Sequence, residues 1–205
     1  MKHIYFVSNN MVSRANVIYP KETTFNEVRE KTMLSFKGEE LARNLVKNEE
    51  LNKIDVIYSS PYFCAMNTCK YFAEAKCLDV VLDSRLGERV IGELGCNEYR
   101  FLKGMQEHDF DYKLSNGESL NDVKKRMDAF LYDVILSTDR NILVVTHNIA
   151  LLSLLLKFCH KGFNLYDRLI LDHHDAVIMD GVFHDMDIIE IVYDEGKFVG
   201  VRRLV

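Results

Sequence analysis

The residue best placed for chemistry is His147, which lies between a predicted strand and a predicted helix. Residues 142–145 form a short apolar, mostly β-branched run, which predicts a strand buried on both faces. Thr146, His147 and Asn148 follow, and the leucine-rich run from Ile149 predicts a nearly fully buried helix. In α/β proteins ligands bind where such strands end, and the N–H groups at the start of a helix attract anions. The sequence therefore predicts one half of a phosphate pocket around His147.

Strand and helix patterns alternate along the rest of the chain. Strands are predicted over residues 2–7, 54–58, 79–82, 142–145, 172–179, 188–193 and 198–204. Helices are predicted from Ser35, as the N-cap, to 46, over 62–74, from Ser119 to 136, and over 149–158. Loops are predicted over 11–32 and 85–95, and residues 96–114 are consistent with a lid or a small helical insertion. The alternation predicts one α/β domain over residues 1–205, a three-layer sandwich with a mixed, mostly parallel central sheet and helices on both faces.

The composition is that of a globular protein without an evident nucleic-acid or membrane partner. Of the 205 residues 48% are hydrophobic and 28% are charged, the net charge is −5, and no Lys/Arg-rich run stands out. The first residues do not resemble a signal peptide, and no apolar run approaches the ~20 residues that span a bilayer. Five cysteines at irregular spacing, without a CxxC pair, favour a reduced cytoplasmic location and argue against structural zinc. We expect no cofactor.

Four separate stretches resemble the motifs of one family, the histidine phosphatase superfamily with its phosphoglycerate-mutase-like fold. Residues 4–10 are similar to its first strand, which ends in Arg-His-Gly. Residues 59–68 resemble Ser-Ser-Pro-x-x-Arg-Ala-x-x-Thr, residues 86–92 resemble the Leu-x-Glu-x-x-x-Gly acid loop, and residues 143–148 resemble the second-histidine strand. The resemblance implies that a first histidine forms a phosphohistidine, two arginines and a second histidine hold the phosphoryl oxygens, and an acid-loop carboxyl protonates the leaving group.

The sequence departs from that pattern at the positions that the resemblance makes catalytic. Asn9 stands at the nucleophile position, Ser8 at the first arginine and Cys64 at the second, while Glu88 and His147 remain. An amide nitrogen cannot attack phosphorus as an imidazole does. Each lost charge-assisted hydrogen bond is worth on the order of 1.5–3 kcal/mol. We therefore expect phosphate affinity and turnover to be severely reduced.

The leading hypothesis is a catalytically deficient family member that binds a ligand or a partner through the altered cleft. The expected site has His147, Glu88 and Asn9 at the catalytic positions, and Ser8, Cys64 and Asn148 at the phosphate-binding positions. One alternative is an active phosphatase or mutase that uses His147 and Glu88. Another is a regulatory or structural subunit with an unused cleft. The ligand is expected to be small and anionic or phosphorylated, a protein partner remains open, and the oligomeric state is not indicated.

Three residues near the expected site have competing interpretations. Arg14 and Arg89 could replace the lost positive charge, although the sequence favours a solvated position for both. Cys64 could have a lowered thiol pKa at the start of a helix, or could simply fill the space of an arginine, which is the favoured interpretation.

A histidine cluster lies outside the family motifs. It comprises His173, His174 and His184 with neighbouring aspartates. Because adjacent residues of a strand point to opposite faces, His173 and His174 would not easily share one metal ion. Metal binding is therefore the less favoured interpretation.

Overall fold

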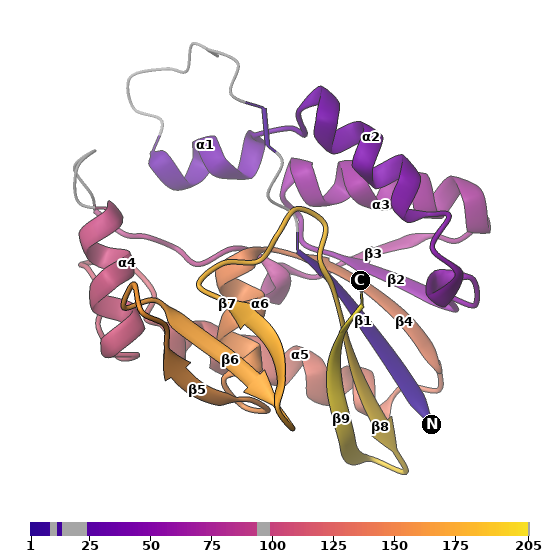
Figure 1. Cartoon of the computed structure of the whole chain (residues 1–205). Coiled ribbons are helices and arrows are strands. Elements are labelled where there is room, and N and C mark those ends of the chain that lie inside the picture. The colour runs from indigo at the N-terminus through magenta and orange to yellow at the C-terminus, as the bar shows by residue number, and fades with distance from the viewer. Residues whose placement is uncertain (9–11, 14–23, 94–98, 205) are drawn as a thin grey trace.

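A computed structural model describes residues 1–8, 12–13, 24–93 and 99–204 of the chain (Figure 1). Its strands are β1 (Lys2–Ser8), β2 (Val56–Ser59), β3 (Val80–Leu82), β4 (Asn141–Thr146), β5 (His160–Phe163), β6 (Leu169–His173), β7 (Ala176–Asp180), β8 (Ile188–Asp194) and β9 (Lys197–Leu204). Its α-helices are α1 (Phe25–Lys31), α2 (Phe36–Leu45), α3 (Phe63–Lys76), α4 (Tyr99–His108), α5 (Leu120–Leu136) and α6 (Asn148–Leu155). Short 3₁₀ turns cover Glu49–Leu51 and Ser84–Leu86.

The central sheet has six strands in the order β3-β2-β4-β1-β8-β9. The first four run parallel, whereas β8 and β9 are antiparallel to their neighbours. Ser8 of β1 pairs with Thr146 of β4, and Ser59 of β2 pairs with Val145. The carboxyl ends of the three central strands therefore meet at one edge of the sheet, as the sequence predicts for the site.

Helices cover both faces of this sheet, which confirms the predicted layers (Figure 1). Ile4 and Phe6 of β1 face the core that α5 and α6 complete, whereas Tyr5 and Val7 face the core on the α2 and α3 side. A strand with apolar residues at every position is buried on both faces, which explains why no polar alternation marks β1 or β4.

Local signals place several helices correctly. The Ser35 side chain accepts a hydrogen bond from the Gly38 N–H, and Ser119 forms a reciprocal capping box with Asp122. The prediction that the helix after His147 is buried throughout is also confirmed, although α6 ends at Leu155 rather than near 158.

Two expectations about local structure are wrong, and one strand was not predicted. The interval 11–32, expected to be loops, contains α1, which begins at a capping box between Thr24 and Glu27. Residues 172–179, expected as one strand, form a hairpin because His174 and Asp175 adopt positive φ angles of 47° and 64° in the turn between β6 and β7. The strand β5 was not expected.

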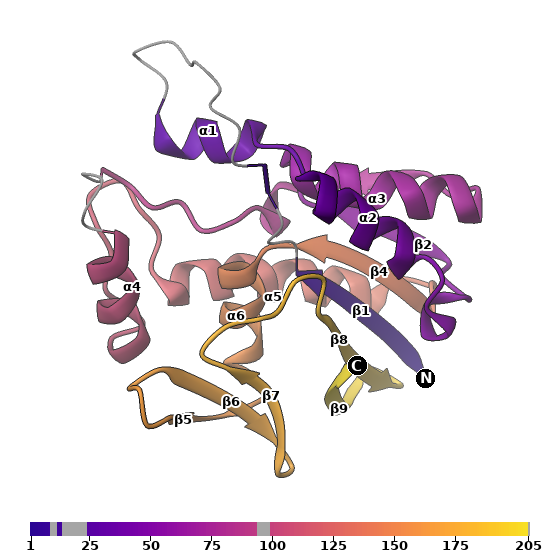
Figure 2. The same cartoon turned by 45° about the horizontal axis from the view of Figure 1, so that its top comes forward.

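Strands β5, β6 and β7 form a second, antiparallel sheet, which lies beside α4 and α6 in both views (Figure 2). His108 at the end of α4 stacks on Phe163 of β5, with ring centroids 4.7 Å apart. Within the predicted lid or helical insertion, the described residues Tyr99–His108 form α4. None of the helices in the described ranges is long and apolar enough to cross a membrane.

Candidate functional site

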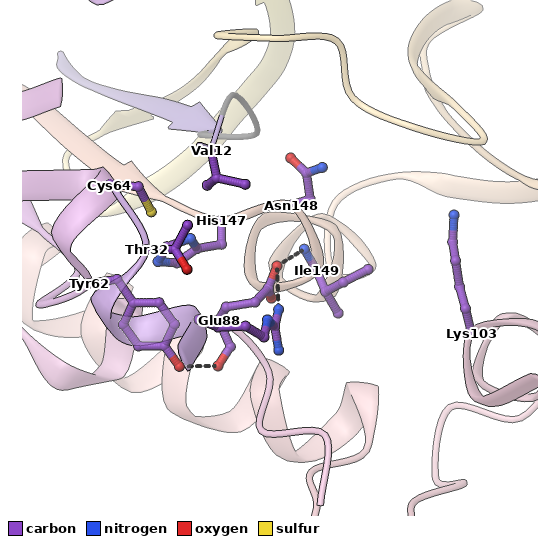
Figure 3. A pocket seen from close by; sticks show the side chains of 10 residues that line it. Val12, Thr32, Tyr62, Cys64, Glu88, Lys103, His147, Asn148 and Ile149 are labelled. Atoms are coloured by element: carbon purple, nitrogen blue, oxygen red, sulfur yellow. Dashed lines mark hydrogen bonds and ion pairs between the residues drawn. The ribbon is translucent and has the colours of Figure 1, made fainter. Parts of the chain in front are cut away.

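A cavity of about 320 Å³ opens at the edge where β1, β2 and β4 end (Figure 3). The described residues that line it are Val12, Arg29, Thr32, Tyr62, Cys64, Glu88, Lys103, His147, Asn148 and Ile149. The structure therefore brings together Cys64, Glu88, His147 and Asn148, four of the residues that the sequence assigns to the site.

Glu88 lies at the N-terminus of α6. Its carboxylate accepts hydrogen bonds from the backbone N–H groups of Ile149 and Ala150, each at 3.2 Å, and from that of Arg89 at 2.7 Å. The guanidinium of Arg29 is 3.8 Å away. Burial raises the pKa of Glu88, but the charges of Arg29 and Arg89 and the hydrogen bond from the Arg89 N–H oppose this effect, and the pKa is lowered overall. Glu88 is therefore an ionised carboxylate at neutral pH.

Arg126 fixes the loop that carries Glu88. Its guanidinium donates to the carbonyl oxygens of Arg85 and Gly87 at 2.6 and 2.8 Å, and it pairs through two nitrogens with Glu118. The Glu118 carboxylate also accepts from the Val90 N–H at 2.8 Å. These contacts hold the loop on both sides of Glu88.

His147 is the N-cap residue of α6 and is 5% exposed. Its Nε2 is 2.8 Å from the Ser60 hydroxyl, and its ring packs against Tyr62 with centroids 4.7 Å apart. Burial lowers the pKa of His147 to about 4, since it outweighs the opposing charge of Glu88. The imidazole is therefore neutral at neutral pH and cannot contribute a fixed positive charge to the pocket.

Cys64 lines the cavity but is not an activated thiol. Its side chain is 2% exposed, and burial raises its pKa to about 11. At neutral pH it is therefore a protonated, weak hydrogen-bond donor.

Ser8 lies at the same sheet edge but does not line the cavity. It is fully buried, its N–H donates to the Asp187 carbonyl at 3.2 Å, and its hydroxyl has no partner among the described residues. Asn148, the first residue of α6, faces the cavity. Asn9 and Arg14 lie outside the described residues.

The structure adds two cations that sequence reasoning missed, Arg29 and Lys103. The Arg29 side chain also donates to the Arg89 carbonyl at 3.0 Å, and Lys103 lies 3.5 Å from Glu107 one turn along α4. Lys103 reaches the cavity from the side opposite Cys64 (Figure 3). The Thr24–Glu27 capping box could have located the helix that carries Arg29, but no local signal places Lys103 in the pocket.

Arg89 corrects an expectation. The sequence favours a solvated side chain, yet Arg89 is 1% exposed and belongs to the largest fully buried side chains. It follows Glu88 in a loop that Arg29 and Asn26 of α1 contact through hydrogen bonds to the backbone of Arg89 and Ile91, and the local sequence does not indicate these tertiary contacts.

The histidine cluster is only partly assembled: the rings of His173 and His174 lie 4.2 Å apart rather than on opposite faces, because His174 adopts a positive φ in the turn after β6. His173 ends β6, where its Nδ1 is 3.0 Å from the Phe158 carbonyl oxygen, and His184 contacts Arg203. Within the described ranges no group of three or more His, Cys, Asp or Glu side chains is placed to hold a metal ion.

The sheet order and the site at the ends of its parallel strands define an α/β protein with a phosphoglycerate-mutase-like fold. The family model of the histidine phosphatase superfamily (branch 1) matches residues 22–187, more than half of the chain. The chain therefore belongs to this superfamily. The matched segment includes Glu88 and His147 and begins after Ser8 and Asn9.

One curated relative is "Putative phosphoserine phosphatase 2" of Hydrogenobacter thermophilus, 31% identical over 115 residues. The match covers 52% of this chain and 55% of that protein, so the chain spans about half the length of the curated relative it matches.

Solved structures show the same fold over nearly the whole chain. A mycobacterial glucosyl-3-phosphoglycerate phosphatase in complex with inorganic phosphate has a TM-score of 0.69 at 16% identity, covering 100% of this chain and 96% of that one. The alpha-ribazole phosphatase of Shigella flexneri has a TM-score of 0.66 at 20% identity, covering 98% and 95%.

Proposed function

We propose that this protein binds a small phosphorylated or otherwise anionic ligand in the cavity without forming a phosphohistidine. The observation that carries the proposal is the make-up of the cavity wall. Arg29 and Lys103 supply two cations, the Cys64 thiol is protonated, and Asn9 stands where the family has its nucleophile. These two cations support attraction for an anion, and the replacement at position 9 supports the absence of a phosphohistidine.

The two cations occupy positions from which the chain can compensate for its missing arginines. Ser8 and Cys64 are neutral, whereas Arg29 and Lys103 reach the same cavity from α1 and α4. The side chains of Arg29 and Lys103 are 22% and 35% exposed, so a ligand can reach them without rearrangement of the core. Arginine and lysine are the usual partners of phosphate oxygens. The three relatives described above are each named a phosphatase, which supports a phosphate ester as the ligand class.

The acid chemistry is also compromised. A general acid must carry a proton near the working pH, but Glu88 has a lowered pKa and its two oxygens are engaged by backbone N–H groups. Asn9 stands where the family has its nucleophile. Loss of a catalytic nucleophile typically costs several orders of magnitude in rate.

One observation favours a second candidate, an active phosphatase. Because burial keeps His147 neutral, its imidazole retains a lone pair, and Ser60 engages only Nε2. An enzyme of this kind would lose its turnover when His147 is replaced.

The test combines calorimetric titration with inorganic phosphate and hydrolysis of p-nitrophenyl phosphate. We expect binding that Arg29→Met weakens about tenfold, the equivalent of one charge-assisted hydrogen bond. Lys31→Met is the matched control, because Lys31 is an exposed cation on the same helix and does not line the cavity. Hydrolysis is expected to be as slow in the wild type as in His147→Ala. Absence of phosphate binding would overturn the proposal, and turnover that depends on His147 would favour the second candidate.

A further inference from the structure

The N-terminus of α6 already binds an anion, the carboxylate of Glu88. The two carboxylate oxygens of Glu88 accept from Ile149 N–H and Ala150 N–H, each at 3.2 Å. Arg29 lies 3.8 Å from the same carboxylate, and the Glu88 side chain is only 8% exposed. The part of the cavity next to His147, where the helix dipole is most favourable for a ligand anion, is therefore occupied by a fixed negative charge.

We propose that Glu88 is a specificity-determining residue, whose carboxylate excludes the anionic group of a ligand from the N-terminus of α6 and leaves it to Arg29 and Lys103, the two cations that line the cavity. This inference rests on the proposed function, because it states where in that cavity the anion lies. The inference also goes beyond the proposed function, since it assigns Glu88 a role other than that of an acid.

The loop around Glu88 is held firmly enough for this role. Arg126 binds the carbonyl oxygens of Arg85 and Gly87, on the N-terminal side of Glu88. The Thr146 hydroxyl donates to the Leu86 carbonyl at 2.8 Å. A carboxylate on such a loop cannot swing out to solvent without breaking several hydrogen bonds, so an incoming anion must bind beside it.

The exclusion of an anion by Glu88 also affects phosphoryl transfer. Two unscreened anions within a few ångströms in a pocket of low dielectric repel each other strongly. His147 is the N-cap residue of α6, and its Nε2 already contacts Ser60, so an anion excluded from this helix terminus is also kept away from the imidazole. Reaction requires close alignment of the attacking atom and phosphorus, so this placement adds to the loss of the nucleophile.

The test is a titration of ¹⁵N-labelled full-length protein with inorganic phosphate at neutral pH, followed by amide chemical shifts. The variants are Glu88→Gln, which keeps the size and one acceptor, and Glu88→Ala, which frees both N–H groups. Glu30→Gln is the matched control, since it removes the same charge from an exposed position on α1 that does not line the cavity. Circular dichroism and thermal unfolding establish that each variant is folded.

In the wild type we expect the amide signals around Arg29 and Lys103 to move, and those of Ile149 and Ala150 to stay. In a folded Glu88 variant we expect at least tenfold tighter phosphate binding, with the Ile149 and Ala150 signals now moving, and no such gain in Glu30→Gln. Unchanged affinity in both Glu88 variants, or large wild-type shifts at Ile149 and Ala150, would overturn the inference. A wild type that binds no phosphate argues against the proposed function alone, because a gain in the Glu88 variants would still support exclusion by Glu88.

Discussion

Replacing Arg126 by methionine is expected to destabilise the protein through the loop that carries Glu88. Methionine keeps much of the aliphatic stem but removes all of the guanidinium hydrogen bonds. Two of these reach the carbonyl oxygens of Arg85 and Gly87, at 2.6 and 2.8 Å, and two reach Glu118, at 2.8 and 3.0 Å.

The size of the destabilisation follows from the hydrogen-bond acceptors that lose the Arg126 guanidinium. Hydrogen bonds to a charged group contribute about 1.5–3 kcal/mol each, although neighbouring contributions do not simply add. The Glu118 side chain is 22% exposed and still accepts from Val90 N–H, so water can replace part of what it loses. The two carbonyl contacts remain the main loss, and the free energy of unfolding should fall by about 3 kcal/mol.

The assay is urea denaturation followed by circular dichroism, with Lys125→Met as the control. Lys125 is the preceding residue of the same helix, its side chain is 81% exposed, and its only described ion pair is 4.0 Å long. The control should change stability by less than about 0.5 kcal/mol. A loss below about 1 kcal/mol in Arg126→Met, or equal losses in both variants, would refute the view that Arg126 anchors this loop.

Two further predictions concern buried titratable groups. Burial lowers the pKa of His147 from 6.5 to about 4, so the unfolded chain binds more protons between these values and stability falls as the pH drops through that window. This group changes the free energy of unfolding by at most about 1.4 kcal/mol per pH unit, and urea denaturation of His147→Gln should lack this contribution. If the stability of the wild type and of the variant changed with pH in the same way, the prediction would be contradicted. Burial raises the pKa of Cys64 to about 11, so iodoacetamide at about pH 8 should label the exposed Cys77 far faster, as peptide mass spectrometry would measure. Faster labelling of Cys64 would show that its thiol is activated.

The parts of the fold that the sequence predicts well have strong local causes. The Ser35 and Ser119 caps and the apolar run before His147 each determine their structure from a few neighbouring residues. Strands that end in the expected motifs then bring residues 64, 88 and 147 to one cavity, because parallel strands share an edge.

The parts that the sequence does not predict depend on tertiary placement or on single backbone angles. The short α1 has no buried residue, so it shows no apolar stripe, and only its capping box marks it. The turn at His174 and Asp175 uses positive φ angles without glycine, which hides the hairpin. Neither the burial of Arg89 nor the approach of Lys103 follows from any local pattern, because both depend on how distant segments pack.

The most direct test of the central claim is a crystal structure of the protein soaked with vanadate, which mimics both phosphate and the five-coordinate transition state of phosphoryl transfer. The account predicts a non-covalent anion in contact with the side chains of Arg29 and Lys103, with Glu88 still bound to the N-terminus of α6. A vanadium–nitrogen bond to His147, or a cavity without the anion while vanadate binds elsewhere, would contradict it.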